Sequence, residues 1–280
     1  MAPNSPTAPI LFDRALLGAR LARAQRKGAV TFLLERAAED MADRLLAVSR
    51  SFSAAADVWT PDAGVADALR GRVGAVETIA FTESEALALA PESLDLAVSA
   101  LALQFVNDLP GVLAQLRRAL KPDGLLLAAM LGGDTLTELR QSFAAAEAEC
   151  EGGASPRVAP FADLRDIGAL LQRAGFALPV TDVDRVVVRY ANAFSLMRDL
   201  RSMGATNVLR ERRRIPTRRA TLLRMAQIYA ERFADGDGRI RATFDIVWLS
   251  GWAPHHSQPK PLKPGSAKAS LEAAVKSTKR

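Results

Sequence analysis

The sequence predicts an α/β protein built on a parallel, doubly wound sheet. Three observations predict this class: apolar runs of strand length alternate with patterns of helical period, glycine or proline separates many of them, and 49% of the 280 residues are hydrophobic. Alternating strands and helices are typical of parallel sheets whose strands are joined by crossover helices. A chain of this length can bury a full core in one large or two small domains.

The N-terminal half supplies most of the predicted sheet. Residues 11–48 form an amphipathic helical pattern, broken near Gly28, that we expect to lie across an edge of the sheet. Strand-like runs follow at 54–59, 75–81, 93–101 and 125–131, with helical patterns at 62–70 and 110–120. In the KPDG turn before the last run, Pro122 stops the helix and Gly124 is expected to take the tight backbone turn.

The C-terminal half predicts further helices and two strands. A helix is expected at 135–150, with Thr135 and Glu138 as a capping box, and another at 162–174. Strands are expected at 183–188 and 243–249, on either side of an arginine-rich helical segment. The predicted organisation is N-terminal helices at 1–50, a sheet domain at 51–192 and 240–253, a basic helical lid at 193–239, and a flexible tail at 254–280.

Positive charge is concentrated toward the C-terminus. Residues 1–183 carry a net charge of −6 and residues 184–280 one of +12, which together give the chain its +6. The run RERRRIPTRR at 210–219 is the strongest charge feature, and it is either a solvated lid face or a docking surface for an acidic partner. Nucleic acid is disfavoured as that partner because the run has neither interleaved aromatic residues nor a recognition motif.

The sequence shows no sign of secretion, membrane insertion or metal binding. The N-terminus reads as neither a secretory signal nor a membrane span, so we expect a cytoplasmic protein without a transmembrane segment. Cys150 is the only cysteine and is expected to be at least half-buried in a helix. His255 and His256 are adjacent, which does not fit the spacing of metal ligands on a helix, so no metal site is predicted. His255 is a candidate general base or substrate contact.

Several motifs resemble one enzyme family. The helix–KPDG–strand unit and the preceding LDLAVSALALQFVNDLPG resemble class I methyltransferases that use S-adenosylmethionine, in the branch of the malonyl carrier-protein methyltransferase of biotin synthesis. The segments LGGDTLTELR, GGASPRVAPFADLRDIGALLQRAGF, LMRDLRSMGATN and ATFDIVWLSGWAPHHSQPKPLKPGSA look like the methyltransferase-like assembly factors of respiratory complex I and their bacterial relatives. The resemblance covers roughly residues 95–268. It implies a Rossmann-like class I methyltransferase sheet with a helical lid insertion, S-adenosylmethionine as cofactor, and a complex I subunit as protein partner.

The turn after the first predicted strand departs from that family. In such methyltransferases an acidic residue is followed by glycines at alternate positions, because the cofactor must approach the backbone closely. Here Asp57 keeps the acidic place, whereas the glycine places fall on Trp59, Pro61 and Ala63, with Gly64 one step late. The glycine cradle is therefore largely lost, although Asp57 and Gly64 stay candidates for cofactor contact.

The sheet is also predicted to be shorter than the family's. Asp95 comes only 36 positions after Trp59, which leaves room for one helix and one strand where the full fold has two of each. One βα unit is therefore expected to be missing at the sheet edge. The acidic residue that would bind the ribose hydroxyls has only Glu77, Glu83 or Glu85 as replacements, and Glu85 is kept as the candidate.

The other candidate site residues come directly after predicted strands or lie in the segments that resemble the complex I assembly factors. Asn107 and Asp108 come after the third strand and are candidate catalytic residues beside His255, with a helix N-cap as the alternative for the pair. Asp134 follows two glycines at the end of the next strand, where a ligand could approach a helix N-terminus. The proposed substrate contacts are Asp134, Arg140, Arg157 and Asn207.

Three functions compete at this stage. The first is methyl transfer from S-adenosylmethionine to a small acid, a carrier-bound acid or a protein side chain. The second is a non-methylating assembly factor that grips a complex I subunit, either hydroxylating an arginine, as the resemblance implies, or acting only as a chaperone. The third is nucleic-acid binding. We predict a methyltransferase-like protein of the complex I assembly type with a degenerate cofactor loop.

Overall fold

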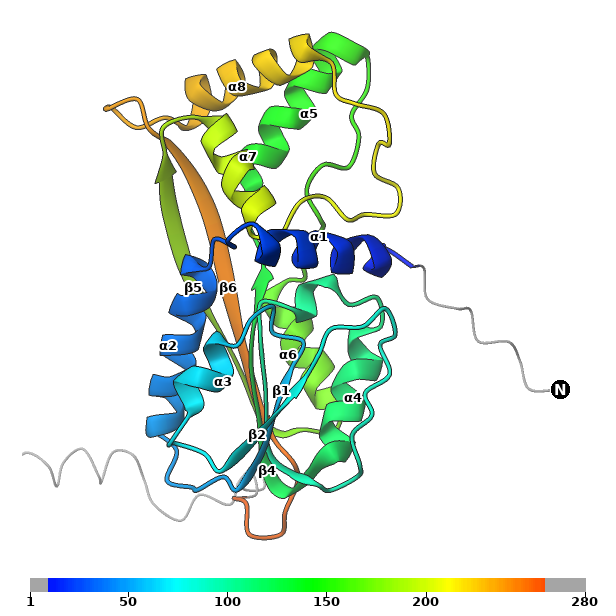
Figure 1. Cartoon of the computed structure of the whole chain (residues 1–280), viewed down its shortest axis with the longest axis vertical. Coiled ribbons are helices and arrows are strands. Elements are labelled where there is room, and N and C mark those ends of the chain that lie inside the picture. The colour runs from blue at the N-terminus through cyan, green and yellow to red at the C-terminus, as the bar shows by residue number, and fades with distance from the viewer. Residues whose placement is uncertain (1–9, 260–280) are drawn as a thin grey trace, which may run out of the picture.

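The computed structural model describes residues 10–259 and shows two lobes joined by one long pair of strands (Figure 1). The strands are β1 (Ala54–Val58), β2 (Ala75–Ile79), β3 (Leu94–Ala100), β4 (Leu120–Gly132), β5 (Ala177–Tyr190) and β6 (Ile240–Trp252). The helices are α1 (Arg14–Arg26), α2 (Phe32–Leu46), α3 (Gly64–Leu69), α4 (Leu109–Ala119), α5 (Thr137–Glu151), α6 (Leu164–Arg173), α7 (Ala193–Ser202) and α8 (Arg219–Phe233).

All six strands form one sheet in the order β2-β1-β3-β4-β6-β5. The first four pair in parallel, whereas β6 runs antiparallel to both β4 and β5. The predicted α/β class is confirmed, with the difference that β6 runs antiparallel to the other five strands. Only α3 and β2 stand between β1 and β3, which confirms the predicted loss of one βα unit.

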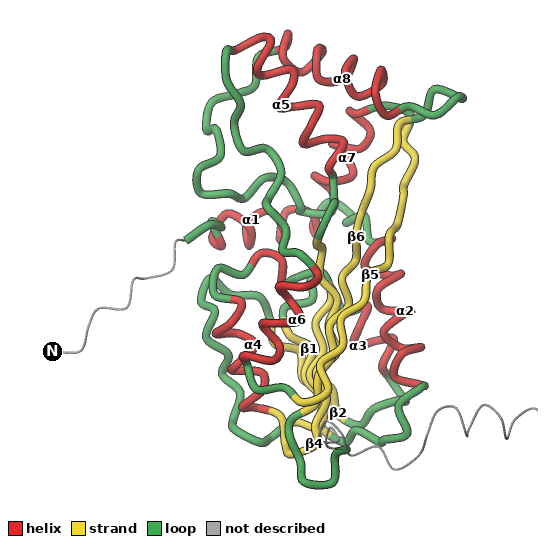
Figure 2. The backbone as a smooth tube through the Cα atoms, turned by 180° about the vertical axis from the view of Figure 1, so that it is seen from behind, coloured by secondary structure: helices red, strands yellow, loops and turns green. Residues whose placement is uncertain are grey.

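Helices cover both faces of the sheet (Figure 2). Helices α2 and α3 lie on one face, and α4 and α6 on the other. Because both faces are covered, most residues of β3 (LDLAVSA) and all residues in the middle of β4 (LLLAAML) are apolar. Helix α2 buries Leu34, Ala37 and Met41 in the same cluster as Leu96 and Val98 of β3, so the expectation that it crosses the sheet edge was wrong.

The second lobe consists of α5, α7 and α8 and is called the helical lobe below. Helices α7 and α8 are inserted between β5 and β6, whose upper halves extend beyond the other strands to reach them (Figure 1). Helix α5 packs against α8, so the helical lobe includes an element from outside the inserted segment. Tyr229 of α8 and Phe143 of α5 belong to the core cluster that also contains Val98, so the lobes share one core.

The KPDG turn differs from its prediction. Strand β4 already begins at Leu120, and Asp123 rather than Gly124 adopts a left-handed conformation, with φ of 64°. Gly124 is needed for a different reason, because a Cβ atom there would lie 2.9 Å from the carbonyl oxygen of Lys121 and 3.2 Å from that of Asp95. The glycine therefore permits a close approach between chain segments rather than an unusual backbone angle.

Two local predictions near α5 were also wrong. Thr135 and Glu138 do not form a capping box: the Thr135 hydroxyl donates to the Gly132 carbonyl at 2.7 Å, and Glu138 accepts hydrogen bonds from Thr243 of β6. Tertiary partners thus replace the local ones. Cys150 is exposed on α5 rather than half-buried.

No helix within residues 10–259 is both long enough and apolar enough to cross a membrane. The flexible tail was predicted for 254–280, of which residues 260–280 lie outside the described part of the chain.

Candidate functional site

The turn after β1 is closed by its own side chains. Trp59 has a φ of 62° and is only 2% exposed. Its backbone N–H donates to the Ile79 carbonyl oxygen at 2.9 Å, so pairing between β1 and β2 continues one residue past the strand. The indole packs in an apolar cluster with Leu87, Leu103 and Val106. It therefore forms part of the core and does not line an open cradle.

Asp57, at the end of β1, is fully buried and tied to the same turn. Its carboxylate accepts a hydrogen bond from the Thr60 hydroxyl, and that hydroxyl accepts one from the Ala100 backbone N–H at 3.0 Å. Burial raises the pKa of Asp57 to about 6, with the Thr60 hydrogen bond opposing the rise and the charge of Asp62 adding to it. The second carboxylate oxygen, Oδ2, has no partner in the described part of the protein.

The contacts of Trp59 and Thr60 determine whether S-adenosylmethionine could bind at the turn after β1. An open α/β sheet binds its ligand outside the carboxyl ends of the strands at the point where strand order reverses, which lies here between β1 and β3. Thr60 bridges the two strand ends at this point, and the Trp59 indole fills the side toward β2. The side chains present do not fit a nucleoside cofactor there, which agrees with the lost glycine cradle.

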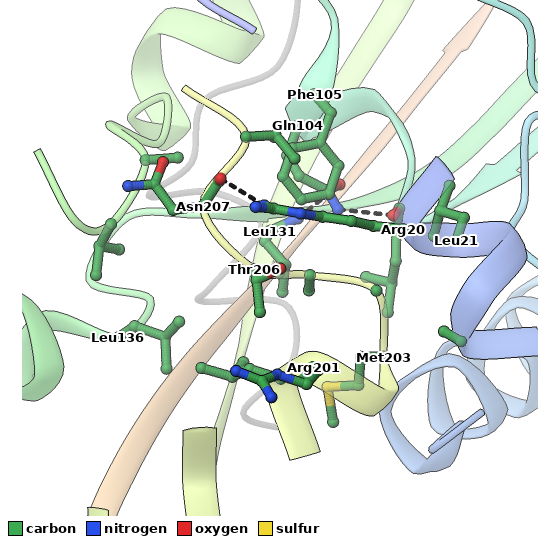
Figure 3. A pocket seen from close by; sticks show the side chains of 18 of the residues that line it. Arg20, Leu21, Gln104, Phe105, Leu131, Leu136, Arg201, Met203, Thr206 and Asn207 are labelled. Carbon is green, nitrogen blue, oxygen red and sulfur yellow. Dashed lines mark hydrogen bonds between the residues drawn. The ribbon is translucent and has the colours of Figure 1, made fainter. Parts of the chain in front are cut away.

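A cavity of about 560 Å³ lies next to this turn, between α1, the carboxyl edge of the sheet and the helical lobe (Figure 3). Its floor is apolar and comes from several elements, including Leu21, Leu101, Leu131, Leu136, Leu139, Phe143 and Phe244. In Figure 3, the Arg20 side chain extends to the carbonyl oxygen of Asn207, and Arg201 lies beside Met203.

Six arginines and one carboxylate line the cavity. The arginines are Arg20, Arg157, Arg201, Arg212, Arg213 and Arg214, and the carboxylate belongs to Asp62. Three of the six have partners elsewhere: Arg157 pairs with Glu147, Arg212 with Asp13 and Arg213 with Glu151. Their charges are therefore largely neutralised by the protein itself.

The other three cavity arginines form no ion pair within residues 10–259. Arg201 and Arg214 are exposed, and Arg20 is half-buried. Burial lowers the pKa of Arg20, and repulsion from Arg212, Arg23 and Arg201 lowers it further. Like charges gathered beside an apolar floor favour an anionic ligand, because such a ligand would relieve this repulsion.

The predicted catalytic pair holds the N-terminal segment in place. Asn107 Oδ1 accepts a hydrogen bond from the Phe12 backbone at 2.7 Å, and Glu85 accepts from the backbone N–H groups of Asn107 at 2.7 Å and Asp108 at 2.8 Å. Asp108 caps α4 by accepting from the Gly111 N–H at 2.9 Å. None of the three candidates lines the cavity.

Three further candidates also lie outside the cavity. Asp134 is 61% exposed and pairs with Arg185 at 2.8 Å, while Arg140 bonds within its own helix. Gly64 begins α3, and its N–H donates to Asp62 at 2.7 Å. Asp57, as described above, faces Thr60.

The structure separates His255 from all of these residues. It follows β6 and lies at the amino end of β4, where the neighbouring Gln258 donates to Asp123 at 2.8 Å. Arg157 and Asn207 are the predicted residues that do line the cavity. Sequence reasoning missed Arg20, Gln104 and Arg201. For these three residues, the basic run at 210–219 was the sequence signal that could have pointed to the same region.

Within residues 10–259 no three His, Cys, Asp or Glu side chains come together as a metal site would require.

The amino-acid sequence of this chain is similar to those of a known protein family. Residues 27–128 match the methyltransferase domain. The arginine-hydroxylase NDUFAF5 of Danio rerio is 38% identical over 262 residues, covering 86% of this chain and 81% of its own, and that of Homo sapiens is 36% identical over 291 residues, covering 96% and 84%. A malonyl-[acyl-carrier protein] O-methyltransferase of Laribacter hongkongensis is 41% identical over 186 residues, covering 66% of this chain and 60% of its own.

Among solved structures, the YcgJ protein of Bacillus subtilis matches with a TM-score of 0.52 at 12% identity, covering 77% of this chain and 98% of its own. This likeness shows the fold alone. The NDUFAF5 relatives, together with the methyltransferase-domain match, confirm the family predicted from the motifs. The domain match also supports S-adenosylmethionine as the cofactor of that fold. The closed turn after β1 is a feature of this chain's own side chains.

Proposed function

Because this chain belongs to the family of the mitochondrial arginine-hydroxylase NDUFAF5 proteins, we propose that it is a methyltransferase-fold assembly factor that binds an acidic, partly apolar segment of a respiratory complex I subunit. The binding site in this proposal is the cavity between α1, the sheet and the helical lobe. The observation that carries the proposal is the excess of positive charge around an apolar floor. Carboxylates of the partner would pair with Arg20, Arg201 and Arg214 while its apolar side chains cover the leucines.

The charge of the cavity also bears on which side chain of a partner enters it. An arginine would bring a further positive charge to a site that has three arginines without an ion pair in the described residues and only Asp62 to receive it. Like charges at close range cost free energy in a partly buried site. The cavity therefore favours an acidic segment over an arginine side chain.

Binding of a short fluorescein-labelled peptide of alternating Glu and Leu, followed by anisotropy, tests the proposal. We expect saturable binding that weakens when salt is raised from about 50 to about 300 mM, because exposed charge pairs are screened. The Arg201→Glu and Arg214→Glu variants should each weaken binding about tenfold, through loss of one attraction and gain of one repulsion.

The matched control is Arg72→Glu, which reverses an exposed arginine on the sheet lobe outside the cavity. It should leave the affinity unchanged. Equal binding of a Lys/Leu peptide, or equal losses in all three variants, would contradict a specific acidic site. In cells lacking the gene, the assembled complex I seen on native gels should return with the wild type and with Arg72→Glu, but not with Arg201→Glu plus Arg214→Glu.

Methyl transfer from S-adenosylmethionine to a carboxylate is the second candidate. The malonyl-[acyl-carrier protein] O-methyltransferase relatives favour it, since arginines suit a carboxylate substrate. Calorimetric titration with S-adenosylmethionine tests it. Micromolar binding would support the enzyme, whereas no binding at millimolar ligand would support assembly without methylation. If a Trp59→Gly, Pro61→Gly variant alone gained binding, the side chains of the turn would be shown to be the obstacle.

A cytoplasmic location is part of the proposal, although the named relatives are mitochondrial proteins. Cell fractionation tests it, and recovery of the chain outside the cytoplasmic fraction would contradict it.

A further inference from the structure

Arg14, the first residue of α1, is a buried cation enclosed by two aromatic rings. It is 5% exposed, and its guanidinium carbon lies 4.7 Å from the ring centroid of Trp59 and 4.4 Å from that of Phe81. Its Nε donates to the Glu83 carbonyl oxygen at 3.0 Å and its Nη2 to the Thr82 carbonyl oxygen at 2.8 Å. The third nitrogen, Nη1, is buried without a partner in the described part of the protein.

The place that Arg14 occupies is defined by the sheet. Trp59 directly follows β1, and Phe81 comes two residues after the end of β2. These strands are parallel neighbours, so their carboxyl ends lie side by side beside the point where strand order reverses. This is where open α/β sheets receive their ligands.

The contacts of Arg14 are also of the kind that a nucleobase makes. A guanidinium is planar and delocalised, and it stacks on aromatic faces as a base does. Its N–H groups donate in plane to fixed acceptors, here two backbone carbonyls, with the carboxylate of Glu85 at 3.6 Å. A purine with an exocyclic amino group has the same combination of a flat face and in-plane donors.

We propose that the Arg14 guanidinium is an internal ligand that fills the slot between Trp59 and Phe81, and that a purine nucleoside would enter this slot once Arg14 has left it. The chain thereby replaces the nucleoside half of a cofactor with one of its own side chains. The slot is separate from the cavity assigned to the partner, since neither Arg14 nor Trp59 nor Phe81 lines that cavity.

The internal ligand also accounts for the position of α1. This helix presents Arg20, Leu21 and Gln25 to the cavity, so anchoring its first residue to the sheet fixes one wall. The preceding residues are held by the same region, because Phe12 bonds to Asn107 and packs edge-on against Phe105 at 5.8 Å between ring centroids. A bound nucleoside would not connect α1 to the sheet in this way, because it shares no covalent bond with that helix.

Titration of the full chain with adenosine, by calorimetry, tests the proposal directly. The wild type should show no binding at about 1 mM adenosine, whereas Arg14→Ala should bind it with a gain of at least about tenfold in affinity. Methylguanidinium should compete with adenosine for the variant, since both would occupy the vacated slot. Arg14→Lys is the matched control, because its aliphatic stem and ammonium group still fill the space, and it should not gain adenosine binding.

Thermal unfolding gives a second readout that does not depend on affinity for adenosine. Arg14→Ala should have a lower Tm than the wild type, and about 10 mM methylguanidinium should restore several degrees of it, because a ligand that binds only the folded state stabilises that state. Methylammonium at the same concentration should restore nothing, since it has no planar face.

Wild-type binding of adenosine that is as tight as that of Arg14→Ala would overturn the proposal. So would equal effects of methylguanidinium and methylammonium on Tm. If Arg14→Ala fails to fold, Arg14→Gln keeps part of the side chain and carries the same comparison. Loss of peptide binding in Arg201→Glu would bear only on the proposed partner cavity and would leave this inference untouched.

Discussion

Trp59 adopts the left-handed backbone conformation that glycine favours, at a position where the family resemblance predicts glycine. Its φ of 62° costs about 1 kcal/mol for a residue with a side chain, and burial of the indole compensates for that cost. The positive φ that glycine would supply in a ligand-binding turn is thus kept at this residue, while the Trp59 indole fills the space that a ligand would need.

This strain predicts an unusual order of stabilities at position 59. Both Trp59→Ala and Trp59→Gly should lose about 3–5 kcal/mol because a large buried side chain is removed. Glycine should nevertheless be better than alanine by about 1 kcal/mol, because it tolerates positive φ. Urea unfolding measures both values.

Trp248 is the control, because it is equally buried at 2% exposed but lies in the regular strand β6. There the order should reverse, with alanine better than glycine by about 0.5–1 kcal/mol. The same order at both positions would show that backbone strain at Trp59 plays no part.

Asp57 predicts a dependence of stability on pH. Its pKa is raised to about 6 in the folded protein from an ordinary 3.8, so the stability from this group is fully present below pH 3.8 and is lost as pH rises through 6. Asp57→Asn removes the buried charge while keeping an acceptor for Thr60. It should therefore stabilise the protein at pH 8 by up to about 3 kcal/mol, the free energy that such a pKa difference represents, and by much less at pH 4.5.

Denaturant unfolding at both pH values gives this comparison. The exposed Asp43, in α2, provides the control, since Asp43→Asn removes a carboxylate that is not buried. A gain of the same size at pH 8 and pH 4.5 would mean that ionisation of Asp57 is not its cause.

At the level of elements, the start of α4 distinguishes a structural role from a catalytic one. Asp108 follows β3 at the ligand-binding edge of the sheet, which made it a catalytic candidate, but its carboxylate caps the helix through the Gly111 N–H at 2.9 Å. Pro110 then stands within the first helical turn, where its missing N–H costs nothing.

Capping predicts which substitutions at Asp108 are tolerated. Asp108→Ala should lower the free energy of unfolding by about 1 kcal/mol, because a backbone N–H at the start of the helix loses its acceptor. Asp108→Asn and Asp108→Ser should recover most of this loss. The affinity for the Glu/Leu peptide should stay at the wild-type value in all three. A loss of peptide binding in Asp108→Asn without a loss of stability would instead point to a role in the site.

At the level of the whole molecule, α1 connects the sheet to the loop that follows α7. Asp13, the N-cap of α1, forms an ion pair with Arg212 at 3.1 Å, and the pKa of Asp13 is lowered first by a hydrogen bond from the Leu16 backbone and also by Arg212. This ion pair holds α1 to the loop at 203–218, called the basic loop below, while Arg14 holds α1 to the segment after β2.

This link predicts how the basic loop responds to trypsin. Asp13→Asn keeps the cap on Leu16 but removes the charge that holds Arg212, so cleavage within 210–219 should become several times faster. The exposed pair of Asp67 on α3 and Arg70 just after it supplies the control, and Asp67→Asn should leave the cleavage rate unchanged. Mass spectrometry of timed digests locates the cuts. An unchanged rate in Asp13→Asn would mean that this ion pair does not restrain the loop.

Much of the fold was predictable because it depends on local pattern. The alternation of apolar runs gave the strands, and the distance from Trp59 to Asp95 left room for only one βα unit. The errors arose where a distant partner outweighed the local signal. Glu138 bonds to Thr243 instead of capping its own helix, and α2 lies on a sheet face because its apolar side fits there.

The sequence by itself determined the class of fold, the missing unit and the loss of the glycine cradle, because residue type, period and spacing are properties of neighbouring positions. Only the tertiary structure decided that Arg14 fills the slot between Trp59 and Phe81. It also decided that the arginines of α1, α7 and the basic loop surround one cavity. Such contacts join segments far apart in the chain, and their geometry follows from the order of the strands and the packing of α1 between the lobes, which no local pattern records.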